Sequence, residues 1–149
     1  MTVALAESLT GGEVASAIVD RPGVSTWFAG SLVTYSSSLK AALLSVKNEE
    51  LDTFGAASEW VARRMAKGVI ARTGVEVGVA VTGVAGPGPD LFGTPEGTVH
   101  VAVATPAGLR HRALLATGGR AAIRDASVVA TLELLLEALE TLPPRRSAA

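Results

Sequence analysis

Short apolar runs alternate with amphipathic segments along most of the chain. Apolar and β-branched residues in runs of this length are typical of buried or half-buried strands. Three such runs predict strands at 2–6, 30–35 and 75–83. The first two are followed by segments that predict helices at 11–20 and 36–46.

The clearest amphipathic helix is predicted over 58–74. Val61, Met65 and Val69 recur there at four-residue steps, which places them on one stripe of a helix. Gly74 is a natural end for this helix, because glycine readily adopts the left-handed conformation that follows a helix.

The second half of the chain predicts a long loop over 84–96 and a hairpin over 97–116 that turns at 106–108. A last helix is predicted over 120–142, and its second half is apolar almost all round. Such a helix needs cover on more than one side, so we expect a homodimer or a larger homo-oligomer.

Strands that alternate with helices, together with one hairpin, predict an α/β fold: a three-layer α/β/α sandwich with a mixed sheet. We expect one domain over 1–142 and a disordered tail over 143–149. Ligands of such sheets lie at the carboxyl ends of the strands. Three polar turns, 7–12, 35–40 and 82–88, are predicted to converge there.

Composition narrows the classes of function. The net charge is −1 and only 18% of residues are charged, so we expect neither nucleic acid nor an anionic membrane as a partner. No apolar run reaches the ~20 residues of a membrane span, and no signal peptide is evident, which predicts a cytoplasmic protein. There is no cysteine, and His100 and His111 lie eleven residues apart, so we expect no metal and no cofactor.

Ser8 stands where the first strand is predicted to end and a helix to begin. Ser8 or Thr10 could cap that helix, or Ser8 could be a nucleophile. Gly11 and Gly12 allow close backbone approach, so N–H groups from Thr10 to Gly12 could bind a phosphate or an oxyanion. The local sequence leaves these alternatives open.

Lys40 lies near the start of a predicted helix, where the helix dipole disfavours a cation. Together with partial burial, this would lower its pKa and provide a neutral amine as a base. A solvated lysine is the alternative, and Tyr35 could be a core residue. Residues 37–40 also match the weak Ser-x-x-Lys pattern of penicillin-binding enzymes, whose companion motifs are missing.

Two further features could bind a ligand. Thr82 and Gly83 begin a glycine-rich turn that could hold a phosphate or a ribose, or be a tight loop alone. Arg120 and Arg124 stand one helical step apart and could clamp an anion together, or be solvated surface arginines.

Six motifs occur in an order that resembles the CinA C-terminal family of competence/damage-inducible proteins, which includes stand-alone nicotinamide mononucleotide amidases. The resemblance runs from Thr2 to Leu142. The motifs are AESLTGG, GVSTWFAGSLVTYSSSLKAALLSV, FGAASEWVARRMAKG, VTGVAGPGP, PEGTVHVAVAT and GGRAAIRDAS.

The resemblance implies a small-molecule nucleotide substrate, whose carboxamide is hydrolysed to nicotinate mononucleotide and ammonia in pyridine-nucleotide recycling. It implies Ser8 as nucleophile, with Tyr35 and Lys40 as its catalytic partners and no metal. It also places the family's ligand loop at Thr82–Pro87 and its arginine at Arg120.

The chain departs from the family pattern at three places. The family's Lys-Pro-Val-Gly reads Thr94 to Gly97 here, and its Gly-Asp-Arg reads Gly118 to Arg120. The family also usually has a helix before the first strand, so we expect either that the start of this chain is misassigned or that the last helix and a partner subunit cover that face. These departures keep open two alternatives: a different small amide as substrate, and a non-catalytic nucleotide-binding or interaction module linked to competence or DNA damage.

Overall fold

The computed structural model describes residues 1–143. The predicted disordered tail, 143–149, therefore lies, apart from Pro143, outside the described residues. The strands are β1 (Val3–Glu7), β2 (Phe28–Val33), β3 (Val77–Gly83), β4 (Thr98–Thr105) and β5 (Gly108–Leu115). The helices are α1 (Glu13–Val19), a 3-10 turn η1 (Val24–Thr26), α2 (Ser37–Leu44), α3 (Asn48–Phe54), α4 (Glu59–Thr73) and α5 (Arg120–Glu140).

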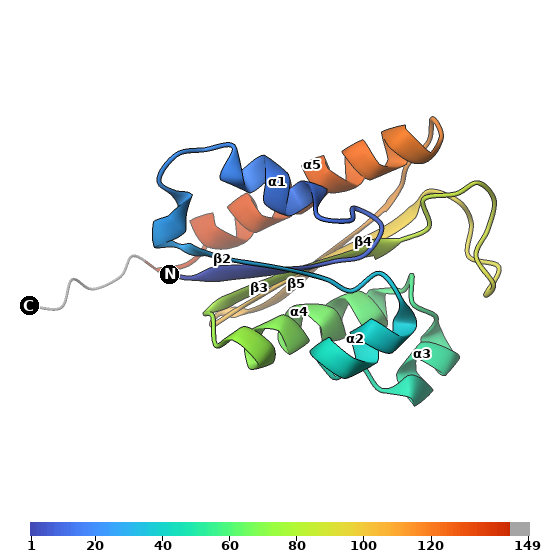
Figure 1. The fold of residues 1–149 in the computed structure, drawn as a ribbon, viewed down its shortest axis with the longest axis horizontal. Helices are drawn as coiled ribbons and strands as arrows, with labels where there is room; N and C mark the ends of the chain where they lie inside the picture. The colour runs from blue at the N-terminus through green and yellow to red at the C-terminus, as the bar shows by residue number, and fades with distance from the viewer. Residues whose placement is uncertain (144–149) are drawn as a thin grey trace, which may run out of the picture.

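The five strands form one mixed sheet in the order β2-β1-β3-β4-β5. β1 runs parallel to β2 and β3, whereas β4 is antiparallel to β3 and β5. Helices α1 and α5 cover one face of the sheet, and α2, α3 and α4 lie on the other (Figure 1). The predicted α/β/α sandwich with a mixed sheet is therefore confirmed.

Two apolar cores lie on the two faces of the sheet. Alternation along β1 sends Val3 and Leu5 to the core under α1 and α5, and Ala4 and Ala6 to the core under α4. On the α4 side the sheet residues are small. A Cβ added at Gly78 would lie 2.1 Å from the carbonyl oxygen of Ala66, so α4 packs directly on the backbone of β3.

Most predicted elements are confirmed with shifted ends. The stripe of Val61, Met65 and Val69 is fully buried against the sheet. β2 begins at Phe28, two residues earlier than the predicted strand. Helix α3 was missed, because its seven residues carry a single buried apolar side chain, Leu51, and show no clear apolar stripe.

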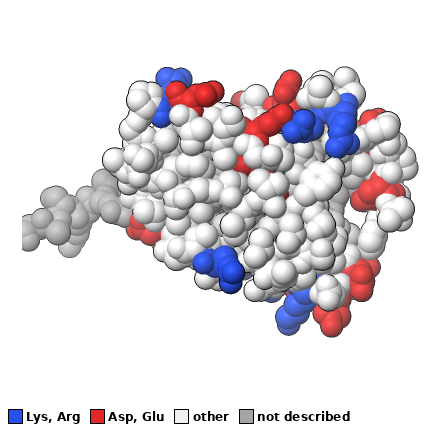
Figure 2. Space-filling model, in the orientation of Figure 1, with Lys and Arg blue, Asp and Glu red and all other residues white. Residues whose placement is uncertain are grey.

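Charged side chains lie scattered on the surface. On the face shown in Figure 2, acidic and basic side chains lie interspersed in small groups, and no large patch of one sign is seen. Within residues 1–143, no helix is long and apolar enough to cross a membrane.

Candidate active site

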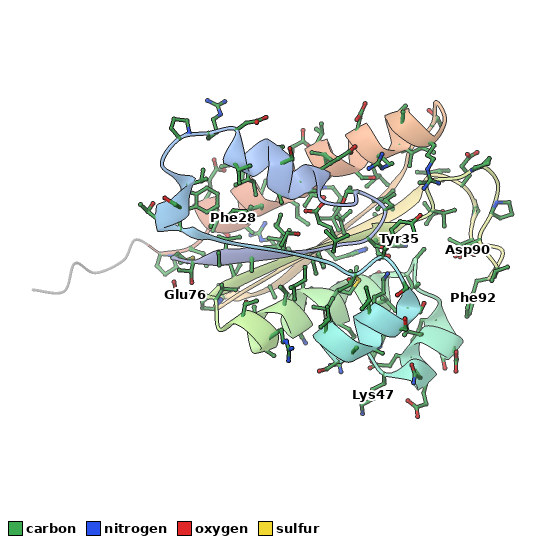
Figure 3. All side chains as sticks on the ribbon, viewed as in Figure 1. Phe28, Tyr35, Lys47, Glu76, Asp90 and Phe92 are labelled. Carbon is green, nitrogen blue, oxygen red and sulfur yellow. The ribbon has the colours of Figure 1, made fainter. Side chains whose placement is uncertain are left out.

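The three polar turns expected to converge line one pocket of about 310 Å³ at the carboxyl ends of β1, β2 and β3. Parallel strands end at the same edge of a sheet, which is why turns far apart in sequence meet there. Figure 3 shows Tyr35, Asp90 and Phe92 at this end of the molecule and Glu76 at the other. Of the predicted site residues, those that line the pocket are Ser8, Tyr35, Lys40, Thr82, Gly83 and Arg120.

Ser8 directly follows β1 and is 7% exposed. Its N–H donates to the carbonyl of Val81 on the neighbouring strand at 3.0 Å, so the sheet ladder extends to this residue. Strand pairing thus fixes the backbone of Ser8 while its side chain faces the pocket.

Lys40 is completely buried, on the first turns of α2. Its Nζ lies 2.9 Å from Ser8 Oγ, 2.7 Å from the Thr34 carbonyl oxygen and 3.1 Å from the Tyr35 carbonyl oxygen. Burial lowers the pKa of Lys40 from 10.5 to about 8, because the charged amine loses its hydration. The direction agrees with the prediction from sequence.

These contacts suit a neutral amine. A neutral lysine has two N–H groups and one lone pair, and two carbonyl oxygens are available to accept the two N–H groups. Nζ donates to Ser8 Oγ across 2.9 Å. Once Lys40 is neutral, its lone pair is left to accept the serine proton across the same distance. The pair can therefore transfer the serine proton to the amine.

Tyr35 contributes its backbone and its side chain to different parts of the pocket. Its carbonyl accepts from Lys40, whereas its hydroxyl accepts from Arg120 Nη2 at 3.1 Å. Arg120 Nη1 also donates to the carbonyl of Gly86. The tyrosine side chain is 59% exposed, so it belongs to the rim of the pocket rather than to the core.

Thr82 and Gly83 shape the pocket floor. The Thr82 hydroxyl donates to the Ala56 carbonyl at 2.8 Å and ties β3 to the loop before α4. A Cβ at Gly83 would lie 2.5 Å from the carbonyl oxygen of Thr98, so glycine is required for the close approach of β4. The loop after β3 also lines the pocket, as far as Asp90. The Asp90 carboxylate accepts hydrogen bonds from the N–H groups of Phe92 and Thr94, both at 2.9 Å.

Thr10, Gly11 and Gly12 do not line the pocket, and the structure gives them another use. The Thr10 hydroxyl and the Gly12 N–H donate to the carboxylate of Glu7 at 2.7 and 3.1 Å, and the Gly11 N–H donates to the Ser8 carbonyl at 3.1 Å. The N–H groups of both glycines therefore already have acceptors within the turn. Gly12 precedes α1 but supplies no side-chain cap.

Glu7 is the residue that sequence reasoning missed. It is completely buried, and its carboxylate accepts five hydrogen bonds, including those from the N–H groups of Val14 and Ala15 and from the Ser31 hydroxyl. It thus fastens the start of α1 and the strand β2 to the turn that carries Ser8. The sequence signal that could have indicated this role is a carboxylate at the end of an otherwise apolar, buried strand.

Arg124 does not join Arg120 in a clamp at the pocket. Its guanidinium donates to the carbonyls of Leu9 and Thr10 and forms an ion pair with Glu13 at 3.0 Å. The expected pair of anion-binding arginines is therefore divided: Arg120 reaches the rim, and Arg124 holds the Ser8 turn from behind.

His100 and His111 lie on different strands, as expected, and contact each other at 3.0 Å between Nδ1 and Nε2. Partial burial lowers the pKa of both rings. In the described part of the chain, no group of three or more histidine, aspartate or glutamate side chains could hold a metal ion.

Fold and site together define a class: an α/β/α domain whose pocket joins a serine after the first strand to a buried lysine on the helix after the second. The model of the CinA C-terminal domain matches residues 1–139. The chain belongs to this family.

Similar proteins agree with this assignment. A "CinA-like protein" of Desulfotalea psychrophila is 42% identical over 135 residues, which are 91% of this chain and 33% of the relative. The chain thus spans about a third of the length of such relatives. Two similar crystal structures are those of a competence-damaged protein (CinA) superfamily protein of Escherichia coli and of a competence/damage inducible protein of Agrobacterium tumefaciens. The Escherichia coli structure has a TM-score of 0.90 and 32% sequence identity, and the match covers 93% of this chain and 80% of the other. The Agrobacterium tumefaciens structure has a TM-score of 0.87 and 39% sequence identity, and the match covers 92% of this chain and 84% of the other.

Proposed function

We propose that this domain is a nicotinamide-nucleotide amidase, which hydrolyses the carboxamide of nicotinamide mononucleotide to nicotinate mononucleotide and ammonia. The observation that carries the proposal is the buried Lys40 amine 2.9 Å from the Ser8 hydroxyl in an open pocket. Membership of a family that includes such amidases supports the choice of substrate.

The first half of the reaction acylates Ser8. Neutral Lys40 takes the hydroxyl proton as Ser8 Oγ forms a bond to the carboxamide carbon. The tetrahedral intermediate collapses as its C–N bond breaks, and the Lys40 ammonium returns the proton to the leaving amine, so ammonia departs. The product of this half is a nicotinoyl ester on Ser8 and a neutral Lys40.

The second half hydrolyses the ester. Lys40 takes a proton from a water molecule, whose oxygen attacks the ester carbon, and then returns that proton to Ser8 Oγ as the C–O bond breaks. Nicotinate mononucleotide is released, and both side chains regain their starting states. No metal ion is needed for either half.

The rim of the pocket is proposed to bind the ribose and phosphate. Arg120 provides the positive charge there, and its bond to the Tyr35 hydroxyl holds the guanidinium in place. The turn that begins at Thr82 and Gly83 provides the adjoining wall. The backbone carbonyl of Tyr35 orients Lys40. The hydroxyl of Tyr35 is therefore proposed to contact the nucleotide rather than the lysine.

Ammonia release from nicotinamide mononucleotide by the purified protein tests the proposal, with Ser8→Ala as the control. We expect release by the wild type and a loss of about 10³-fold or more in the variant. A folded protein that binds the nucleotide, as seen by thermal shift, but releases no ammonia would instead favour the non-catalytic module.

A further inference from the structure

The loop between β3 and β4 forms one wall of the pocket. All residues from Val84 to Asp90 line it. The two ends of the loop are joined at its base, where the Gly97 N–H donates to the Val84 carbonyl at 2.8 Å and the Val84 N–H donates to the Thr98 carbonyl at 2.9 Å. Backbone hydrogen bonds therefore fix the base of this wall.

The tip of the loop, residues 87–95, is held together by its own hydrogen bonds. The Asp90 N–H donates to the Thr94 carbonyl at 3.1 Å, and the Gly93 N–H donates to the Asp90 carbonyl at 3.0 Å. The Asp90 carboxylate accepts from the N–H groups of Phe92 and Thr94. In the part of the chain that the structure describes, no hydrogen bond of the tip reaches farther than the first residue of β4. The tip is thus a compact unit that needs packing contacts to keep its place.

Phe92 makes such a contact with Gly55, the residue that directly follows α3. A Cβ added at Gly55 would lie 3.1 Å from Cγ, 3.3 Å from Cδ1 and 3.4 Å from Cδ2 of Phe92. Such similar distances to three adjacent ring atoms mean that the ring turns its face to Gly55. Figure 1 shows the tip of the loop bending toward α3, and Figure 3 labels Phe92 there. The bare backbone of glycine, whose φ is 79° here, lets the ring approach this closely.

The turn that receives the ring is fixed on several sides. The Gly55 N–H donates to the Leu51 carbonyl at 2.9 Å, and the Ser58 hydroxyl donates to the Gly55 carbonyl at 2.7 Å. A hydroxyl from β3 donates to the Ala56 carbonyl at 2.8 Å. Ala56 and Ala57 themselves line the pocket. The ring contact therefore joins the loop wall to a second, fixed wall of the same pocket.

The loop can bend between its fixed base and its tip. Arg120 donates to the Gly86 carbonyl, which extends the fixed part of the loop to this residue. Gly88 follows with a φ of 78°, and no described atom beyond its chain neighbours lies within 4 Å of the position that a Cβ would take. Glycine has the widest choice of backbone conformations. Without the ring contact, the tip is therefore free to turn at Gly88.

We infer that Phe92 is a positioning residue of the active site: its ring, seated on Gly55, holds the loop wall against the turn between α3 and α4 and thereby sets the width of the pocket. Phe92 is not among the residues that line the pocket, so it acts through the loop and not by contact with the substrate. Ser8 and Lys40 are held separately, by the sheet and by α2, so loss of the ring should widen the pocket and leave this pair intact. The inference rests on the proposed function for the site, and the nicotinamide nucleotide enters only as the substrate of one test.

A distance measurement between the loop and α3 tests the contact without any substrate. The chain has no cysteine, so Leu91→Cys in the tip and Asp52→Cys on α3, both at exposed positions, can each carry one nitroxide label. Double electron–electron resonance should give a narrow distribution of distances between the labels. Adding Phe92→Ala should broaden the distribution toward longer distances. Leu115→Ala, which shortens an exposed apolar side chain on β5, should leave it narrow.

Ammonia release from nicotinamide mononucleotide tests the effect on the site. We expect Phe92→Ala to raise KM about tenfold, because one wall no longer holds the substrate, with the pH midpoint unchanged. Phe92→Tyr, which keeps the ring, should restore the wild-type KM. Leu91→Ala, which shortens a fully exposed side chain of the same tip, should have no effect. A merely structural role of Phe92 would lower the fraction of folded enzyme and thus kcat, with KM unchanged.

Three results would overturn the inference: a distance distribution that is already broad with Phe92 present, a distribution that Phe92→Ala leaves narrow, or a wild-type KM in Phe92→Ala. A distribution that broadens on Phe92→Ala, in a protein that releases no ammonia from nicotinamide mononucleotide, supports the inferred loop contact and contradicts the proposed function.

Discussion

At the scale of single residues, the site depends on a lysine that is buried without a carboxylate partner. Its three contacts are two carbonyl oxygens and one hydroxyl, none of which carries a charge. The protein thus disfavours the ammonium form without supplying a counter-ion. With a pKa of about 8, roughly a tenth of Lys40 is neutral at neutral pH.

The pH dependence of the amidase should report this lysine. Because Lys40 must be neutral to accept the serine proton, kcat/KM should rise about tenfold per pH unit and level off above about pH 8. A pH–rate profile of ammonia release measures this midpoint. Lys67→Met, which removes an exposed lysine on α4, should leave the midpoint unchanged. A midpoint near 10.5, or a flat profile, would show that Lys40 is not the base.

At the scale of elements, buried polar or small residues set the positions of the helices around the site. Glu7 binds the start of α1 and the side chain of Ser31 on β2, and Gly68 lets α2 approach α4. These residues matter to the site because β1 leads into Ser8 and α2 carries Lys40.

Glu7→Gln should destabilise the fold by about 2–4 kcal/mol. The carboxylate accepts five hydrogen bonds, and an amide offers one acceptor oxygen and presents an NH2 group to the other donors. Denaturant unfolding measures the loss. Glu133→Gln, on the exposed face of α5, should change stability by less than about 0.5 kcal/mol. Equal stabilities of the two variants would contradict the role given to Glu7.

Gly68→Ala should displace α2 and with it Lys40. A Cβ at Gly68 would lie 2.1 Å from the Leu44 carbonyl oxygen, which is backbone and has to move. We expect a loss of about 1–3 kcal/mol and a fall in kcat at pH values where Lys40 is neutral. Thermal unfolding and ammonia release measure both effects. Lys67→Ala, the exposed neighbour on the same helix, is the control, and normal activity in Gly68→Ala would show that α2 is not constrained here.

At the scale of the whole molecule, the buried lysine couples stability to pH. Its folded-state pKa of about 8 lies below the unfolded value, so the unfolded chain binds more protons between these values. The free energy of unfolding should therefore rise with pH across this window.

Comparison with Lys40→Met isolates this contribution. The wild type should gain up to about 3 kcal/mol relative to the variant between about pH 8 and about pH 10.5, with no relative change below about pH 8. Urea unfolding of both proteins over this range measures it. Parallel curves throughout would mean that the lysine is not desolvated in the folded protein.

Self-association stays a prediction. Val129 and Leu136, seven residues apart on α5, are 55% and 59% exposed, which fits an apolar stripe that a second copy could cover. Sedimentation equilibrium should show at least a dimer, and Leu136→Lys should shift the protein toward monomer. A monomeric wild type would contradict the expectation.

The sequence by itself determined the layered fold and the three turns of the pocket, because both follow from local periodicity and from the rule that parallel strands end at one edge. Its motifs also singled out Ser8, Tyr35, Lys40 and Arg120, which the pocket brings together. Only the tertiary structure decided which polar groups pair. Glu7 takes the Gly12 N–H, one of the donors expected to face a ligand, and Arg124 turns to the loop instead of the pocket. Such pairings depend on distances between segments far apart in the chain, and local sequence patterns do not encode those distances.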